Sequence, residues 1–408
     1  MGDCSVRVRA PRIYARAFST AISVIAGRRA LSILAFSGAV MTIGALWHCP
    51  SLVAQTLDSA SGEEPNSSWT ATTDSSSKDG NSRRLLEKHT QEGDRALDTK
   101  SAELRQFDGR FEPYQDIETE TLQSDANTVR TVTRRFGRDG NGEKILVQVD
   151  EEGKHILPSG DSSVRHVTST PDVSGSVRPS RQEFSETKLV GEGAEETETT
   201  IMFPSINGGP VAAEKIHESR TGVGTGTVQS QATTLLLDGS GNWGVSETRQ
   251  SVTNQQGKNR SLEEHISRPN SEGKLVEVSK ILIKESEKTS GEKFKVVETY
   301  SVDVPGKIRD GTLHLVERTT STEQLSLSGE RTIEQKLEQT NPGDPASDLR
   351  VSVLVDSRTV PELSGEQSTV TVRSRDSNGG FGIVSVDTTK SDKLPSFQIE
   401  PKPSEHSK

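Results

Sequence analysis

Histidine is the residue type in this sequence best suited to holding a metal, because its ring nitrogens are common metal ligands. The chain has 408 residues and eight histidines, and none shows a short ligand spacing such as HxxxH. His155 and His166 flank the turn Pro158–Asp161 and could approach each other across a hairpin. We favour two separate, solvated histidines over a metal pair. The eight are His48, His89, His155, His166, His217, His265, His314 and His406.

Two Asp-Gly segments begin like calcium-binding loops. They are Asp139–Glu143 and Asp238–Asn242. A complete loop needs Gly at its sixth position and a bidentate Glu at its twelfth. Turn-forming chemistry explains both segments better than calcium binding, because those positions hold Lys144, Trp243, Asp150 and Arg249 instead.

Catalytic patterns are weak. Gly160–Ser163 (GDSS) faintly resembles an esterase block, but that chemistry needs an α/β scaffold, which the chain does not indicate. Gly222–Gly226 (GVGTG) is rich in glycine, yet no Walker lysine or strand-to-helix junction accompanies it. We therefore assign no catalytic, cofactor-binding or metal residues, and we expect a protein that is not an enzyme and needs no cofactor.

The N-terminal residues 1–54 have the pattern of an export signal. Six arginines against one acid precede Ala30–Trp47, which has 18 residues and no charge, and Ala54 could precede a cleavage site. The segment is either a cleaved signal peptide or a retained membrane anchor. Both cysteines, Cys4 and Cys49, lie within it, so cleavage would leave a chain without thiols. The sequence predicts an exported protein of the periplasm, the cell surface or the medium, or one anchored in the inner membrane.

The composition of the chain limits the kinds of partner that it could bind. Residues 55–408 hold 43 basic and 58 acidic residues, a net charge of −15, which argues against nucleic acid as a partner. We expect membrane contact only through residues 30–47, if that segment is uncleaved. Hydrophobic residues make up 30% of the chain and aromatic residues 4%, too few for an ordinary globular core.

The chain divides into four segments in this interpretation. After the leader (1–54), Ser59–Arg84 contains no Leu, Ile or Val, so 55–105 is predicted to be a disordered spacer. Residues 106–393 form a repeat array, and the proline-containing residues 394–408 form an extended tail.

Turn-forming glycines in the array recur about every 33 residues, in two interleaved series. Segments rich in Thr, Val and Ile separate them, and such residues favour strands over helices or general disorder. Each repeat is therefore predicted to hold two strands and two turns. The first series is Gly109, Gly142, Gly175, Gly208, Gly241, Gly273, Gly311, Gly343 and Gly379. The second is Ala126, Gly160, Gly193, Gly226, Gly257, Gly291, Gly329 and Gly365.

The predicted fold is all-β: an elongated antiparallel meander of tandem hairpin repeats, 33–38 residues each, in a mostly single-layer sheet. A closed membrane barrel is the less favoured alternative. Such a barrel needs apolar residues alternating outward along each strand, and segments such as Glu247–Asn254 (ETRQSVTN) lack this pattern.

Leu236–Asp392 resembles uncharacterised exported repeat proteins of soil bacteria. The resemblance implies export and brings no known activity. Two functions follow from the architecture. The preferred one is a structural or spacer protein of the cell envelope; the alternative is a surface module that binds polysaccharide or protein through a sheet face or edge. The resemblance rests on Gly241–Gly244, Gly257–Ser261, Val297–Gly306, Asn341–Pro345 and Ser385–Asp392.

Overall fold

The computed structural model describes residues 66–78, 80–205, 207–223, 226–303, 311–341, 348–376 and 378–392. The predicted leader (1–54) and extended tail (394–408) lie outside these ranges. All regular structure within them is β-strand. No helix in this part of the chain is long and apolar enough to cross a membrane.

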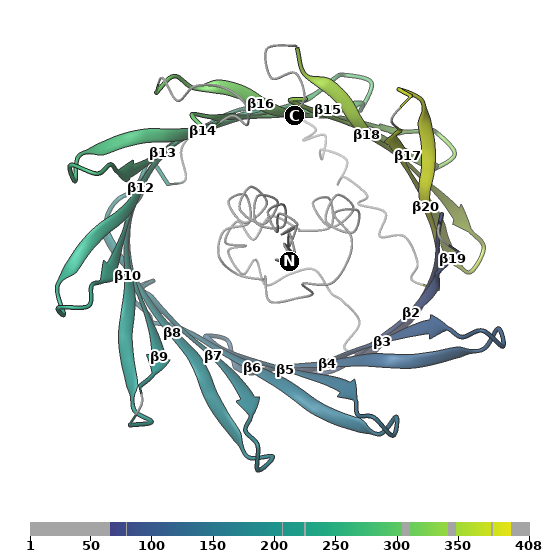
Figure 1. The fold of residues 1–408 in the computed structure, drawn as a ribbon, viewed down its shortest axis with the longest axis horizontal. Coiled ribbons are helices and arrows are strands. Elements are labelled where there is room, and N and C mark those ends of the chain that lie inside the picture. Colours follow the sequence, from purple (N-terminus) through teal and green to yellow (C-terminus); the bar gives the residue numbers. More distant parts are fainter. Residues whose placement is uncertain are drawn as a thin grey trace, which may run out of the picture. The chain divides into compact units, whose positions relative to one another are not determined.

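Twenty strands follow one another along the chain (Figure 1). They are β1 (Asn66–Ser77), β2 (Ser82–Glu92), β3 (Arg95–Arg105), β4 (Phe111–Asp125), β5 (Thr128–Arg138), β6 (Lys144–Ile156), β7 (Ser162–Pro171), β8 (Val177–Gly191), β9 (Ala194–Pro204), β10 (Pro210–Thr221), β11 (Thr227–Leu237), β12 (Trp243–Gln256), β13 (Asn259–Pro269), β14 (Leu275–Glu287), β15 (Lys293–Ser301), β16 (His314–Leu325), β17 (Arg331–Gln339), β18 (Arg350–Glu362), β19 (Gly365–Arg375) and β20 (Phe381–Ser391).

The sheet is closed. Each strand pairs antiparallel with the next, and β1 also pairs antiparallel with β20, from Ala71 opposite Ser391 to Ser77 opposite Ser385. The strands therefore form a ring (Figure 1). The prediction of an elongated, open meander is wrong. Every strand has two neighbours, so the sheet leaves no free edge that would expose unpaired backbone groups.

The predicted spacer, residues 55–105, also needs correction. From Asn66 onward it forms β1, β2 and β3, which belong to the ring. β1 (NSSWTATTDSSS) has too few apolar residues to order itself, which is why its sequence indicated disorder. Its two neighbours, β2 and β20, supply backbone partners on both sides and so order a segment that local composition alone would not.

The turn positions are confirmed. Glycines of the first series have positive φ in the turns that follow odd-numbered strands, for example 84° at Gly241. Glycines of the second series lie in the turns after even-numbered strands, at the opposite end of the ring. In the turn after β10, Gly222 rather than Gly226 has the positive φ. Gly343 lies outside the described residues.

A β-bulge recurs beside the turns that follow odd-numbered strands, and we call this end of the ring the bulge end. Nine of the ten hairpins there carry one. In eight of the nine the extra residue lies five positions after the positive-φ glycine, as Ser246 follows Gly241. Bulges bend a strand and increase its twist, and they are common at barrel rims. The extra residues are Tyr114, Val147, Ser180, Ala213, Ser246, Val278, Val316, Ser352 and Val384.

Burial identifies the inner face of the ring, because side chains on the concave side of a closed sheet are crowded and those on the convex side spread apart. Thirteen side chains are buried, and the ladder register places all except Val132 on one face, which we call the inner face. The inner-face members are Ala71, Val164, Ser185, Thr199, Ile201, Ile266, Ile281, Ser321, Glu323, Gln335, Val355 and Val372.

The ring is wide. With strands about 4.8 Å apart and tilted about 40° from the axis, twenty strands enclose a ring about 40 Å across between backbones. A ring of this width is too large for the wall's own side chains to fill in the way that they fill eight-stranded barrels. The buried layer is therefore a lining of the wall, and no conventional hydrophobic core forms.

Candidate functional site

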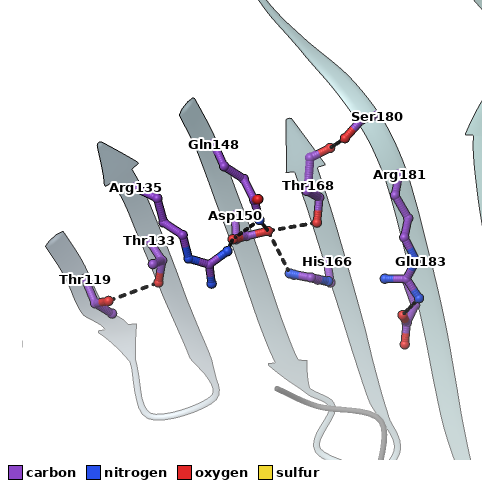
Figure 2. Close-up of polar contacts among 10 residues, drawn as sticks. All are labelled: Thr119, Thr133, Arg135, Gln148, Asp150, His166, Thr168, Ser180, Arg181 and Glu183. Carbon is purple, nitrogen blue, oxygen red and sulfur yellow. Dashed lines mark hydrogen bonds and ion pairs between the residues drawn. The ribbon is translucent and has the colours of Figure 1, made fainter. Parts of the chain in front are cut away.

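The inner face of β4–β8 carries a continuous row of polar side chains (Figure 2). Ladder pairing brings Thr119, Thr133, Asp150, Thr168 and Arg181 side by side across these five strands. The Thr119 and Thr133 hydroxyls are 3.1 Å apart. Because strand residues alternate between faces, all five side chains lie on the inner face.

Asp150 is the centre of this row. Its carboxylate accepts hydrogen bonds from Gln148 Nε2, at 3.0 and 2.7 Å, and from Thr168 Oγ1, at 2.8 Å. His166 Nε2 lies 3.8 Å from Oδ1. In turn, the Thr168 backbone carbonyl accepts a hydrogen bond from Ser180 Oγ at 3.1 Å, which links the row to the bulge on β8.

Arg135 is the cation closest to Asp150. Its Nη1 lies 3.0 Å from Asp150 Oδ2, and the two side chains are 12% and 13% exposed. Within the described structure neither Nε nor Nη1 donates a hydrogen bond, and both atoms are buried. Arg135 is thus held against Asp150 by charge rather than by hydrogen bonds from these two nitrogens.

Charged pairs continue around the inner face of β9–β17. Arg220 contacts Glu218 at 2.6 Å and Glu195 at 3.2 Å. Across β12 and β13, Glu247 contacts Arg249 at 2.6 Å and Arg268 at 2.8 Å. Further pairs are Lys295–Glu285 at 2.7 Å and Arg331–Glu323 at 2.8 Å. We call the inner face of β5–β17 the charged wall.

Carboxyl groups on the charged wall titrate according to their partners. Burial raises the pKa of Glu247, but the hydrogen bonds and charges of Arg249 and Arg268 outweigh it, so the pKa is lowered overall. At Glu264 burial dominates, Arg249 opposes it and the charge of Glu247 adds to it, so that pKa is raised. Neighbouring guanidinium groups, on the same strand and on the next one, therefore decide whether Glu247 is stabilised in the ionised form.

The inner face of β18–β20 and β1, which we call the seam wall, has a different character. Valines and hydroxyl residues line it, including the buried Val355 and Val372. Asp387 is the single ionisable side chain among inner-face residues 71–75, 353–359, 368–374 and 385–389. Burial raises its pKa, and a hydrogen bond involving Ser75 opposes the rise.

The residues singled out from the sequence do not form a metal or catalytic centre. His155 lies on the outer face, 3.0 Å from Thr128 Oγ1, whereas His166 lies on the inner face, so the two cannot share a metal. Asp139 accepts hydrogen bonds from the backbone N–H groups of Asn141 and Glu143, both at 2.8 Å. That is turn chemistry. Within the described ranges no group of three or more His, Cys, Asp or Glu side chains is arranged to hold a metal.

Sequence reasoning missed both the Asp150 row and the charged wall. Arg135 and Asp150 are fifteen residues apart, and their contact depends on a register that the Val147 bulge shifts by one residue. A signal for the bulge was present, because the spacing of five residues after the turn glycine recurs along the chain. Without a rule linking that spacing to a bulge, the faces of the strands could not be assigned.

No family model matches the chain, and no curated protein matches it. Several solved structures are similar in fold. Pseudomonas aeruginosa OccK2 (OpdF) has a TM-score of 0.40 and 9% identity over 80% of this chain and 97% of its own. The siderophore receptor PirA from Pseudomonas aeruginosa has a TM-score of 0.40 and 13% identity, over 79% of this chain and 79% of its own. The FrpB iron transporter from Neisseria meningitidis (F3-3 variant) has a TM-score of 0.41 and 8% identity, over 81% of this chain and 82% of its own.

These similarities concern the strand arrangement and assign neither a solute nor a mechanism to this chain. The resemblance to uncharacterised repeat proteins of soil bacteria is wrong, because the strands close into a ring through the β1–β20 pairing instead of forming an open array of repeats. Ring closure also overturns the spacer function, which depended on an elongated open sheet. Binding through a sheet edge fails for the same reason.

Proposed function

We propose that the chain is an exported transport protein of the cell envelope whose lumen takes up and passes polar solutes. Closure of twenty strands around a wall of ionised and hydroxyl side chains is the observation that carries this function. Such a wall interacts well with water and hydrophilic solutes, and poorly with apolar ones. Transport, rather than catalysis, is the activity proposed.

The outer face restricts how such a conduit could meet a membrane. Ion pairs cross the middle of the outer face, including Arg134–Glu120 at 3.7 Å and Arg318–Glu298 at 2.8 Å. A lipid-facing charge near the bilayer midplane costs about 2–4 kcal/mol for Arg or Lys. The middle of the outer face is therefore suited to water rather than to lipid. The barrel would pass solutes within the aqueous space on one side of a membrane.

Single cysteines test whether the lumen is open. In a full chain with Cys4→Ser and Cys49→Ser, Thr133→Cys places a thiol on the inner face and Thr320→Cys places its control on the outer face. A small charged thiol reagent should label both. Maleimide polymers wider than the lumen should label Thr320→Cys alone. An inner cysteine that no reagent reaches, or one that every polymer reaches, would contradict an open lumen.

Uptake measurements test transport itself. Cells of the native host that lack the protein should take up small hydrophilic solutes more slowly, and the full chain should restore the rate. A variant carrying a bulky, charged adduct at Thr133→Cys should restore less than the same adduct at Thr320→Cys. Uptake that is unchanged by deletion across a panel of polar solutes would refute the proposal.

A further inference from the structure

The outer face changes character at the bulge end. Between each bulge and its turn, the ladder register pairs one or two outer-face residues on each strand, 32 positions in all. Of these, 22 are apolar, and we call the whole set the belt. The apolar positions are Phe111, Pro113, Phe136, Leu146, Pro171, Val177, Pro179, Met202, Pro204, Pro210, Ala212, Leu235, Leu237, Trp243, Val245, Pro269, Leu275, Tyr300, Leu315, Val351, Phe381 and Ile383.

The belt is accessible. Val245 is 39% exposed, Leu275 42% and Ile383 53%. Apolar residues scattered singly over a surface need no explanation, but a continuous exposed group marks an interaction site. Away from this rim the outer face carries mainly charges and hydroxyls, as in the pair Glu118–Arg134, and apolar residues such as Leu122 are scattered among them. The continuous apolar group thus lies at one rim.

Cations accompany the aromatic residues of the belt. The Arg84 guanidinium lies 4.2 Å from the centre of the Phe111 ring. Lys144 Nζ lies 4.0 Å from the Phe136 ring. Lys215 Nζ lies 5.2 Å from the Trp243 ring. Aromatic rings combined with long cationic side chains suit the boundary between lipid headgroups and acyl chains, where the rings insert and the charges reach phosphates.

The charge of the belt differs from that of the chain. Its ionisable members are five cations and three acids, whereas residues 55–408 carry a net charge of −15. The described turns beyond the belt add nine acids and three bases, so the bulge end as a whole is acidic. A second copy docked rim to rim, or an anionic lipid surface, would bring like charges together, whereas a zwitterionic lipid surface would not. The cations of the belt are Arg105, Arg138, Lys144, Arg373 and Arg375, and its acids are Glu103, Glu277 and Glu338.

The height of the belt excludes a membrane-spanning role for it. It covers about four residues along each tilted strand, or roughly 10 Å along the axis. An outward apolar band that spans a membrane is about 25 Å tall. Insertion at the interface requires only about 5–10 Å. We infer that the barrel stands on the surface of a zwitterionic membrane through this belt, with its bulge end in the headgroup region and the rest of the wall in water.

Vesicle flotation tests this docking with matched variants of the full chain. The belt variant combines Val245→Ser, Leu275→Ser and Phe381→Ser, at side chains 39%, 42% and 38% exposed. Its control combines Leu86→Ser, Leu122→Ser and Val252→Ser, outer-face side chains 37%, 42% and 38% exposed but nearer the middle or the other end. Strand circular dichroism should match wild type for both.

The wild-type chain and the control should float with vesicles of phosphatidylcholine. The belt variant should bind at least about tenfold more weakly. Equal binding of the belt and control variants would overturn the docking surface. Dimerisation that the belt variant loses, without vesicle binding by wild type, would assign the belt to a second copy and overturn the lipid partner.

A fluorescent probe reports the depth of insertion independently. In the Cys4→Ser, Cys49→Ser chain, the fluorescence of an environment-sensitive dye at Val245→Cys should shift to the blue when phosphatidylcholine vesicles are added. The same dye at Val252→Cys, seven residues along the same outer face of β12, should not shift. Shifts at both positions would mean that the wall enters the bilayer more deeply than an interfacial belt, and would refute surface docking.

Discussion

The charged wall and the seam wall line the same lumen by different physical means. On the charged wall, directional contacts such as Asp150–Thr168 and Glu247–Arg268 fix each side chain against its neighbour on the next strand. On the seam wall, Val355 and Val372 pack as small apolar surfaces, and Asp387 has Ser75 as its polar neighbour. Polar pairing is specific but fails when one partner is lost, whereas apolar packing loses stability in proportion to the atoms removed.

Position in the ring explains part of this difference. The seam wall contains the β1–β20 junction, which has seven ladder pairs, while the β1–β2 pair has eleven. Small hydroxyl residues such as Thr73 and Thr389 meet there, 2.8 Å apart. Long charged side chains would have to find partners across a junction that forms between the first and last strands. Short side chains reduce that requirement.

The largest effect is expected from Asp150→Ala on the charged wall. It removes the acceptor of Gln148 and Thr168 and leaves the nearly buried Arg135 without its ion pair. The free energy of unfolding should fall by about 2–4 kcal/mol. Urea denaturation measures it. The outer-face control Asp74→Ala, at an exposed pair with Arg84, should cost less than about 1 kcal/mol.

Adding Arg135→Met to Asp150→Ala should restore part of the loss, because no unpaired charge would then remain in the wall. If the losses in free energy of unfolding of the two single variants simply add in the double variant, Arg135 and Asp150 do not interact. The polar account of the charged wall would then be wrong.

Val372→Ala on the seam wall should have the next largest effect. The side chain is 3% exposed and lies opposite Val355 in the ladder. Removing its two methyl groups should cost about 2 kcal/mol, through lost burial and an unfilled space. Val360→Ala on the outer face, 37% exposed, is the matched control and should be nearly neutral. Equal losses at the two valines in thermal melts would mean that the seam wall has no packed layer.

How far the sequence predicts this molecule depends on the range of the interactions. Turns are local, so the rule that Gly tolerates positive φ located Gly241 and its equivalents. Closure joins Ala71 to Ser391, 320 residues apart, through backbone ladders that any polar strand can form. Nothing in the composition of β1 encodes that partner, so the segment was assigned to a spacer and the ring to an open sheet.

The site was hidden for a related reason. Face assignment requires counting by two along each strand, and a bulge such as Ser246 reverses the count for the rest of the strand. Glu247–Asn254 therefore seemed polar without order, although Glu247 and Arg249 face the lumen. The belt could not be recognised from the sequence either, because it includes only one or two outward-facing positions on each strand.

The contributions of Asp387 and Glu247 to stability should change with pH in opposite directions. The pKa of Asp387 is raised above its ordinary 3.8, so the folded chain holds that proton more tightly than the unfolded chain. Stability from this group falls as pH rises through the interval above 3.8. Asp387→Asn should raise Tm at neutral pH, and the gain should shrink towards low pH. Serial thermal melts measure it.

Glu247→Gln should behave in the opposite way. Its pKa lies below the ordinary 4.5, so its contribution is present above that value and lost as pH falls through the lower, folded-state pKa. The variant should melt below wild type at neutral pH and converge with it in acid. Differences of the same sign for Asp387→Asn and Glu247→Gln at neutral pH would remove the electrostatic contrast between the walls.

The smallest effect is expected at the edge of the polar row, where Thr133→Val keeps the shape of the side chain and removes its hydroxyl. The 3.1 Å contact with Thr119 is lost, and the Thr119 hydroxyl can turn to the water of the lumen. The free energy of unfolding should fall by about 0.5 kcal/mol or less. Ser185→Ala, at the buried 2.8 Å contact with Thr199, should cost more, because the remaining hydroxyl has no water to replace its partner. If the two variants lose equal stability, depth within the inner wall does not control the strength of its polar contacts.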